Sequence, residues 1–318
     1  MMEKIDRTIQ IPESCQGMRL DQALANLLPD YSRSRLQSWI KAGFIKVNDC
    51  QMSQREKLSG GELIHIHIHS DADEISSGGQ NIPLEIIYED KDVIIINKPA
   101  GLIVHPGAGN PDNTLYNALL YHYPDLDTVP RAGIIQRLDK DTSGIMVIAR
   151  SLIAHTYLVR DLQERKINRE YQAIIHGSLT AGRTIDAPIG RHPVKRTRMA
   201  VVNSGKPAIT HVRVLTRFNG ITHVLAKLET GRTHQIRVHM AHIHHPVVGD
   251  PIYGGRARHA KDLNRETIDS LNDFPRQALH AWRLQLIHPQ SSQQMTWTAD
   301  LPEDMNSLLS LLKNECSG

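Results

Sequence analysis

Residues 210–229, THVRVLTRFNGITHVLAKLE, hold two strand candidates, THVRVLTRF and THVLAKLE, separated by a short loop. Short connections join antiparallel strands, whereas parallel strands need a crossover of a dozen or more residues. Further segments with the composition of strands are LEIIY, DVIIIN, GIMVIA, REYQAIIHG and HAWRLQLIHP. Helices are expected at 114–122, 151–165, 233–242 and 302–313. Because few helices lie between successive strands, the pattern predicts an α+β domain with a mixed, mainly antiparallel sheet.

A smaller αβ unit is predicted ahead of this domain. The apolar residues from Leu20 to Leu27 follow helical spacing, and RSRLQSWIKA predicts a second helix with Ser32 as its N-cap. FIKVN and ELIHIHIH then have the pattern of strands. The polar, glycine-rich stretch SDADEISSGGQN indicates a linker. We therefore expect a first domain at 17–75, a linker at 76–82 and a second domain at 83–318.

The net charge of +3 hides a strong asymmetry along the chain. Residues 1–130 hold 11 Lys and Arg against 18 Asp and Glu, residues 131–217 hold 16 against 6, and residues 218–318 hold 10 against 10. So basic a middle segment indicates a polyanionic partner. In the first unit, the predicted helix RSRLQSWIKA adds three cations opposite its apolar face: Arg33, Arg35 and Lys41.

Cysteine usage and the N-terminus bear on the compartment. The three cysteines, Cys15, Cys50 and Cys316, lie far apart and match no metal or disulfide spacing, as is typical of a protein in a reducing cytosol. The N-terminal stretch MMEKIDRTIQIPESC has no apolar run, so we expect no signal peptide. No apolar stretch is long enough to span a bilayer. We expect a cytoplasmic monomer without a membrane partner.

The loop GIIQRLDKDTSG, residues 133–144, places a carboxylate between two cations directly before the strand GIMVIA. Arg137 and Lys140 flank Asp139, and nearby cations favour the charged form of a carboxylate. Asp141 lies two residues further on, and in an extended loop it could face the same way. The spacing does not choose between the two carboxylates, and an ordinary solvated turn is a third interpretation.

The segment ETGRTHQIRVHMAH offers a second candidate cation. Thr233 is the expected N-cap of the helix at 233–242, and Arg237, one turn further on, could fork onto a carboxylate or a phosphate. His239 and His242 have i,i+3 spacing, which raises the question of a metal site. No suitable acidic residue lies beside them and no cysteine is near, so we expect packing or RNA contact instead of metal binding.

Two more basic segments fit contact with a nucleic acid. RKINREYQAIIHG places Tyr171 after a basic run, where the ring either packs in the core or stacks on a base. RHPVKRTRMAV has no apolar period, which fits a loop that contacts phosphates, with a merely solvated loop as the alternative. Its cations are Arg191, Lys195, Arg196 and Arg198. The nucleotide-binding patterns GxxxxGK[ST] and GxGxxG and the hydrolase pattern GxSxG are absent.

Several motifs of the chain, taken in order, resemble one enzyme family. RLDKDTSG resembles the RLDxxTSG signature of the RNA pseudouridine synthases that act on uridines in ribosomal RNA. NKPAGLIVHPG, REYQA, GRTHQIRVHMAH, HPVVGDPIYGG and QALHA resemble further blocks of that family, and RLDQALANLLPDYSRSRLQSWIKAGFIKVND resembles the S-four RNA-binding domain that precedes some of its members. Together these blocks cover nearly the whole chain.

The resemblance implies a reaction. The enzyme would break the N1–C1′ bond of specific uridines in 23S ribosomal RNA, turn the base and rejoin it through C5, without metal or organic cofactor. It implies a target in the stem-loop at the subunit interface, with 23S rRNA or the assembling large subunit as the partner. A non-catalytic RNA-binding assembly factor is the alternative. Asp139, not Asp141, matches the catalytic aspartate, acting either as a nucleophile at C1′ or as a base at C2′.

The resemblance also suggests supporting roles. Tyr171 would stack on the target base, Arg237 would pair with the catalytic carboxylate, Leu279 would pack beneath the base, and Arg137 would fill the space of the flipped nucleotide. The expected RNA contacts are Arg33, Arg35, Lys41, Arg191, Lys195, Arg196 and Arg198. One departure is Gln136, where the family usually has histidine, and glutamine cannot exchange protons near neutral pH.

Overall fold

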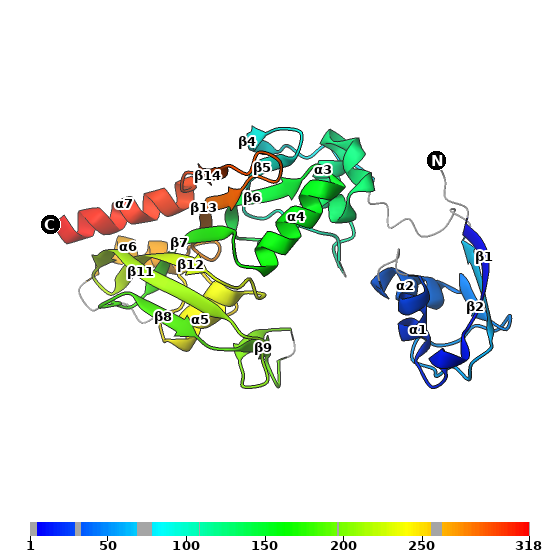
Figure 1. Ribbon diagram of the computed structural model, residues 1–318. Helices are drawn as coiled ribbons and strands as arrows, with labels where there is room; N and C mark the ends of the chain where they lie inside the picture. Colours follow the sequence, from blue (N-terminus) through cyan, green and yellow to red (C-terminus); the bar gives the residue numbers. More distant parts are fainter. Residues whose placement is uncertain are drawn as a thin grey trace. The chain divides into compact units, whose positions relative to one another are not determined.

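The computed structural model describes residues 5–28, 33–68, 78–107, 109–195, 197–255 and 263–317. The chain divides into two compact units, Met1–Ser76 and Ser77–Gly318, each with its own apolar core (Figure 1). Pro29, at the end of the first predicted helix, and Ser32, the expected N-cap of the second, lie outside the described residues. Within the described ranges, no helix combines the length and apolarity that crossing a bilayer requires.

The first unit packs two helices against a three-stranded antiparallel sheet with the order β1-β3-β2. Its elements are β1 (Ile5–Gln10), the 3-10 turn η1 (Glu13–Cys15), α1 (Leu20–Leu27), α2 (Arg33–Ala42), β2 (Ile45–Val47) and β3 (Leu63–Ile68). Both predicted helices and both predicted strands are present, and Leu24, Leu36 and Ile64 are fully buried between them. The strand β1 was not predicted; it pairs along the whole of β3.

The second unit is built on a nine-stranded sheet with the order β4-β5-β6-β13-β7-β12-β11-β8, and β14 pairs with β13. The strands are β4 (Glu85–Glu89), β5 (Val93–Lys98), β6 (Ser143–Ala149), β7 (Asn168–His176), β8 (Arg183–Asp186), β11 (Ile209–Phe218), β12 (Ile221–Leu228), β13 (Leu279–Ile287) and β14 (Gln294–Thr298). Among the strands of the described residues, β6 and β13 are the one pair that runs parallel. The predicted α+β fold with a mixed, mainly antiparallel sheet is confirmed.

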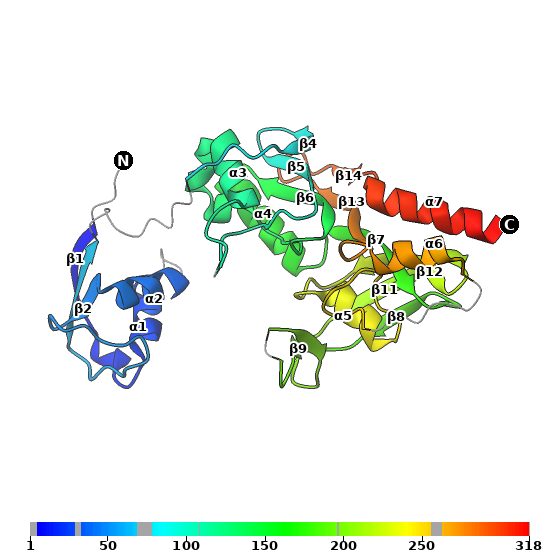
Figure 2. The same ribbon diagram turned by 180° about the vertical axis from the view of Figure 1, so that it is seen from behind.

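Helices cover the sheet of the second unit. They are α3 (Leu115–His122), α4 (Leu152–Gln163), α5 (Gln235–His242), α6 (Arg265–Asn272) and α7 (Glu303–Ser317), with 3-10 turns η2 (Pro124–Thr128) and η3 (Pro130–Gly133) before the Asp139 loop. In Figure 2, α6 and α7 lie above strands β11 and β12, and α5 lies below them. Cover on both faces explains why β12 is buried along nearly its whole length.

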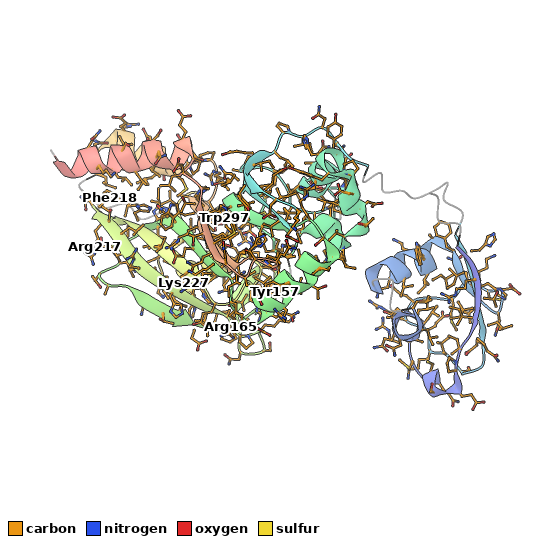
Figure 3. All side chains as sticks on the ribbon, turned by 45° about the horizontal axis from the view of Figure 1, so that its top comes forward. Tyr157, Arg165, Arg217, Phe218, Lys227 and Trp297 are labelled. Atoms are coloured by element: carbon orange, nitrogen blue, oxygen red, sulfur yellow. The ribbon has the colours of Figure 1, made fainter. Side chains whose placement is uncertain are left out.

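Some elements were missed and one helix start was wrong. The sequence did not predict α6, β8, β14 or the short hairpin of β9 (Ile189–Arg191) and β10 (Met199–Val201). Trp297 on β14, labelled in Figure 3, belongs to the core. Its ring centroid lies 5.4 Å from that of Tyr88. Helix α5 starts at Gln235 with His234 as its N-cap, so Thr233 is not the cap.

The end of the predicted linker is hydrogen-bonded to the second unit. The Gln80 amide donates to the Asn117 carbonyl at 2.9 Å, and Asn117 Nδ2 donates to the Gly78 carbonyl at 3.2 Å. Asn117 also completes a capping box with Thr114 at the start of α3. Residues 78–80 are therefore attached to α3. The limits 17–75 and 83–318 stay a prediction.

Candidate active site

The loop that carries Asp139 leads directly into β6, at the point where β6 pairs with β13. Gly144 has φ +115°, and a Cβ there would lie 2.2 Å from the Ala281 carbonyl oxygen. Only glycine therefore allows this close approach of β6 to β13. The approach places the residues before Gly144 at the centre of the sheet, next to the strands that carry Leu279 and Tyr171.

One side of the loop is held by a buried lysine. Lys98, at the end of β5, is 1% exposed, and its Nζ donates to the carbonyls of Pro99, Leu102 and Lys140 at 2.7, 2.9 and 3.0 Å. The Lys140 carbonyl also accepts from the Gly101 amide at 2.9 Å. Burial lowers the pKa of Lys98 to about 7, against the opposing charges of Asp141 and Asp139. The ammonium group therefore joins the NKPAG segment to the residue after Asp139.

The other side of the loop is held from the segment before β13. Arg276 Nη1 donates to the Asp141 carbonyl at 3.1 Å, and Gln277 Nε2 donates to Thr142 Oγ1 at 3.1 Å. Arg276 is itself fixed by a fork onto the Asp304 carboxylate at 2.6 and 2.8 Å. Within the loop, the Thr142 amide donates to the Asp139 carbonyl at 3.1 Å. The backbone around Asp139 is thus fixed from two sides, as a preorganised site requires.

The Asp139 carboxylate itself meets Arg237 of α5. Arg237 Nη1 donates to Asp139 Oδ2 at 2.9 Å, while Nε and Nη2 fork onto Asp250 at 2.7 and 2.9 Å. Burial alone would lower the pKa of Arg237, but the hydrogen bonds and charges of Asp250 and Asp139 raise it. Burial also favours the neutral form of Asp250, yet its bonds to Arg237 keep its pKa low. The arginine is permanently charged and held in one orientation.

A histidine and a tyrosine complete this cluster. His234 Nε2 lies 3.8 Å from Asp139 Oδ1, and His234 Nδ1 lies 2.8 Å from the Tyr253 hydroxyl. The Arg237 guanidinium lies over the Tyr253 ring, 5.2 Å from its centroid. Burial lowers the pKa of His234, although the Asp139 charge acts in the opposite direction. An imidazole in this position is neutral near pH 7.

Tyr171 and Leu279 lie on adjacent strands beside the loop. Tyr171 of β7 is 7% exposed and pairs with Ala281 of β13, while Leu279 pairs with Ala173. Since side chains alternate along a strand, Tyr171 and Leu279 lie on the same face of the sheet. Burial raises the pKa of Tyr171, and the charge of Asp139 adds to this effect. The structure thus brings together Asp139, Arg237, Tyr171 and Leu279.

The remaining predicted residues lie outside this cluster. Arg137 is exposed and Gln136 half-buried in the loop before Asp139. Arg191 and Lys195 are exposed on the β9–β10 hairpin, and Arg198 is half-buried at its end. Lys41 is exposed on α2, whereas Arg196 and the side chains of Arg33 and Arg35 lie outside the described part of the chain.

The site also contains residues that were not singled out from the sequence. They are Lys98, Arg169, His234 as a neighbour of Asp139, Asp250, Tyr253, Arg276 and Gln277. The available signal was their position inside or beside the blocks NKPAG, REYQA, GRTHQIR, GDPIYG and QALHA. Arg169 is buried beside Tyr171 on β7, and its Nε has no hydrogen-bond partner among the described residues. The contact between Asp250 and Arg237 depends on the tertiary fold, so no local sequence pattern predicts it.

Two groups of histidines bear on metal binding. His239 is fully buried and bonds through its two ring nitrogens to Thr210 and to the Ala187 carbonyl at 2.8 and 2.9 Å, so its role is packing. Within the described ranges, the cluster with metal-binding spacing is Asp90, Asp92 and His288. There, Nδ1 of His288 accepts from backbone amides, which leaves the ring hydrogen on Nε2, 3.0 Å from Asp90. That neutral tautomer turns an N–H toward Asp90 and leaves no free lone pair on the ring for a metal.

Comparison with known proteins identifies the family of this chain. The profile of the RNA pseudouridylate synthase family matches residues 92–242, and that of the S4 domain matches residues 18–49. Ribosomal large subunit pseudouridine synthase D of Haemophilus influenzae is 53% identical over 98% of this chain and 96% of its own. The protein of the same name from Escherichia coli is 52% identical over 98% of this chain and 96% of its own. The one from Pseudomonas aeruginosa is 52% identical over 99% of this chain and 98% of its own.

Two solved structures of human proteins are similar to this chain. Human RNA pseudouridylate synthase domain containing 1 matches with a TM-score of 0.53 and 27% identity over 74% of this chain and 96% of that one. Human RNA pseudouridylate synthase domain containing 4 shares the fold, with a TM-score of 0.56 and 24% identity over 72% of this chain and 93% of that one. By full-length sequence similarity, domain content and fold, the chain belongs to the RNA pseudouridine synthases, the isomerases that convert uridine to pseudouridine.

Proposed function

We propose that this enzyme isomerises uridines of 23S ribosomal RNA, in the stem-loop at the subunit interface, with Asp139 as the catalytic carboxylate. The names of the full-length relatives support the large-subunit substrate. The observation that carries the choice of Asp139 is its ion pair with Arg237 at 2.9 Å, in a loop fixed by Lys98 and Arg276. The Asp139 side chain is 17% exposed, so one face remains open to a flipped nucleotide.

The chemistry follows one of two balanced routes. In the first, Asp139 attacks C1′ and the electrons of the N1–C1′ bond leave with uracil; C5 of the turned base then displaces the carboxylate, after which C5 loses a proton and N1 gains one. In the second, Asp139 removes the proton from C2′ as the N1–C1′ bond breaks, C5 adds to C1′ and the proton returns to C2′; C5 then loses its own proton and N1 gains one. Both routes begin from an ionised carboxylate, which Arg237 stabilises.

The neighbouring residues would contact the target base and the RNA backbone around it. Tyr171 would stack on the uracil, with Leu279 packing on the same side of the sheet. Arg137, exposed just ahead of Asp139, would occupy the gap left by the flipped nucleotide. Arg33, Arg35 and Lys41 of the first unit, and Arg191, Lys195, Arg196 and Arg198 around the β9–β10 hairpin, would contact phosphates. We place the enzyme in the cytoplasm, as a monomer acting on free rRNA or on the assembling subunit.

The substrate assignment is tested by mapping pseudouridine. Purified protein is incubated with transcribed 23S rRNA, and pseudouridines are located by carbodiimide treatment and primer extension. The expected stops fall in the subunit-interface stem-loop, and the same stops disappear from rRNA of a deletion strain. RNA binding without any new stop would instead support an assembly factor. Substrate deuterated at C2′ separates the two routes, because only removal of that proton gives a primary isotope effect.

A further inference from the structure

The two oxygens of the Asp139 carboxylate have different neighbours. Oδ2 accepts from Arg237 Nη1 at 2.9 Å. Oδ1 lies 3.8 Å from His234 Nε2, which is closer than unrelated side chains but too long for a hydrogen bond. His234 is 19% exposed, so the imidazole forms part of the wall of the site and does not extend into solvent.

Hydrogen bonding to Tyr253 bears on which nitrogen of His234 carries the hydrogen. The Met199 amide donates to the Tyr253 hydroxyl oxygen at 2.9 Å, and an amide N–H can only donate. The single hydroxyl hydrogen of Tyr253 is then free to donate to His234 Nδ1 at 2.8 Å. A neutral imidazole that accepts at Nδ1 carries its hydrogen on Nε2. When Tyr253 donates in this way, the hydrogen of His234 lies on Nε2, 3.8 Å from Asp139 Oδ1.

The backbone and the Tyr253 ring hold this orientation. His234 has φ +56°, a left-handed conformation that is unfavourable for a residue other than glycine. Such a conformation persists only where the surrounding structure imposes it, and it often marks functional sites. The Tyr253 ring packs edge-on against His234, 5.6 Å between centroids, and its backbone amide is tied to Asp250 at 3.0 Å. Asp250 also anchors Arg237, so both neighbours of Asp139 share one support.

We propose that His234 is a positioning residue for Asp139, and that Tyr253 sets the tautomer in which His234 acts. Arg237 holds Oδ2 by a hydrogen bond, and His234 Nε2, 3.8 Å from Oδ1, limits by contact and charge the positions that Oδ1 can take. The part of the Asp139 side chain that stays exposed, 17%, is then the part available to the ribose. This role rests on the proposed function of Asp139, and it concerns the rate of the chemical step and not the affinity for RNA.

The first test removes the hydroxyl and keeps the ring. Tyr253→Phe is expected to lower the single-turnover rate about tenfold to 100-fold, since a small misplacement of a reacting group can cost 100-fold. Its Kd for RNA should stay at the wild-type value, because the ring still packs on Arg237 and His234. In protein labelled with 15N on histidine, the wild-type His234 should carry its hydrogen on Nε2. In Tyr253→Phe the 15N chemical shifts of His234 should become those of a mixture of the two tautomers.

The second test uses a matched pair at position 234. His234→Gly tolerates the left-handed backbone but lacks the donor, so its turnover should fall about 100-fold. His234→Gln places an amide N–H close to the position of Nε2, and it should recover most of that loss despite a less favourable backbone. The difference between the 15N spectra of wild type and His234→Gln assigns the His234 signals.

The possible outcomes separate this inference from the proposed function. If Asp139→Asn is inactive while Tyr253→Phe and His234→Gly turn over like wild type, the positioning role is wrong and Asp139 keeps its role. The same follows if the Nδ1–H tautomer predominates at neutral pH, or if His234→Gln is no better than His234→Gly. Turnover by Asp139→Asn would instead overturn the proposed function itself.

Discussion

Arg237 is shared between two carboxylates, donating through Nη1 to Asp139 at 2.9 Å and through Nε and Nη2 to Asp250 at 2.7 and 2.9 Å. The Asp250 side chain is fully buried, whereas that of Asp139 is 17% exposed. The buried carboxylate fixes the arginine, and the arginine presents a permanent positive charge to Asp139, the proposed catalytic carboxylate. A single side chain therefore links the stability of the site to its chemistry.

Replacing this arginine should affect both properties. In Arg237→Met the buried Asp250 loses its partner, and we expect the free energy of unfolding to fall by about 3–5 kcal/mol. Turnover should fall at least ~100-fold, since Asp139 loses its cation. The double variant Arg237→Met/Asp250→Asn contains no unpaired buried charge and should regain part of the stability. Urea unfolding and single-turnover rates would show this, and a recovery of turnover in the double variant would contradict the role of Arg237.

The buried Lys98 should give the fold a distinctive dependence on pH. Its pKa is lowered from 10.5 to about 7, so between these values the unfolded chain binds more protons than the folded chain. Unfolding free energy then rises with pH through this window. Lys98→Met should lose this rise, and it should also be less stable by about 1–3 kcal/mol because a carbonyl such as that of Lys140 loses its donor.

Urea unfolding of wild type and Lys98→Met at pH 7 and pH 9.5 measures the Lys98 effect. The quantity that matters is the difference between the two proteins, because other groups titrate equally in both. If the two proteins change in parallel over this range, the lowered pKa of Lys98 is wrong.

The aromatic ring of Tyr171 should matter more than its hydroxyl. Tyr171→Leu retains apolar volume in the buried position but cannot stack, so binding of the flipped uridine should weaken by about 1–3 kcal/mol. Tyr171→Phe serves as the matched control and should bind RNA as wild type does. Affinities for RNA with and without the target uridine isolate the contribution of the flipped base. Equal affinities of the Leu and Phe variants would argue against stacking.

The β9–β10 hairpin should contribute to affinity through phosphate contacts. Lys195→Ala is expected to weaken RNA binding and to reduce the slope of log K against log salt by about one. Arg265 on α6 is a matched control, because its side chain is 95% exposed outside the proposed RNA contact. Binding titrations over a range of salt concentrations measure the slopes. An unchanged slope in Lys195→Ala, or an equal change in Arg265→Ala, would exclude the hairpin as a phosphate contact.

The sequence predicts the parts of this structure that have local causes. The helical spacing from Leu20 to Leu27 and the apolar runs of β5, β6 and β12 identify long elements with strong patterns. Short strands such as β9 and β10, three residues each, have too few positions to show a period. The helix α6 begins with an Asn264 cap and buries only a narrow face, which a scan for apolar runs overlooks.

The site is predictable only in part, for a related reason. The charges flanking Asp139 mark this loop in the sequence. They do not show which of Asp139 and Asp141 pairs with Arg237. The structure distinguishes them by their contacts: Arg237 bonds the side chain of Asp139, whereas Arg276 bonds the backbone carbonyl of Asp141. The pairing of Arg237 with Asp250 and the relay from Met199 through Tyr253 to His234 join distant segments, so they become visible only in the fold.

The central claim, that Asp139 performs the chemistry, is tested most directly by tritium release. Loss of the C5 hydrogen during isomerisation releases tritium from 23S rRNA labelled at C5 of uridine. Under single-turnover conditions, Asp139→Asn should release none above background while binding the RNA normally, and Asp141→Asn should release it at a rate of the same order as wild type. Tritium release by Asp139→Asn at the wild-type rate would contradict the account.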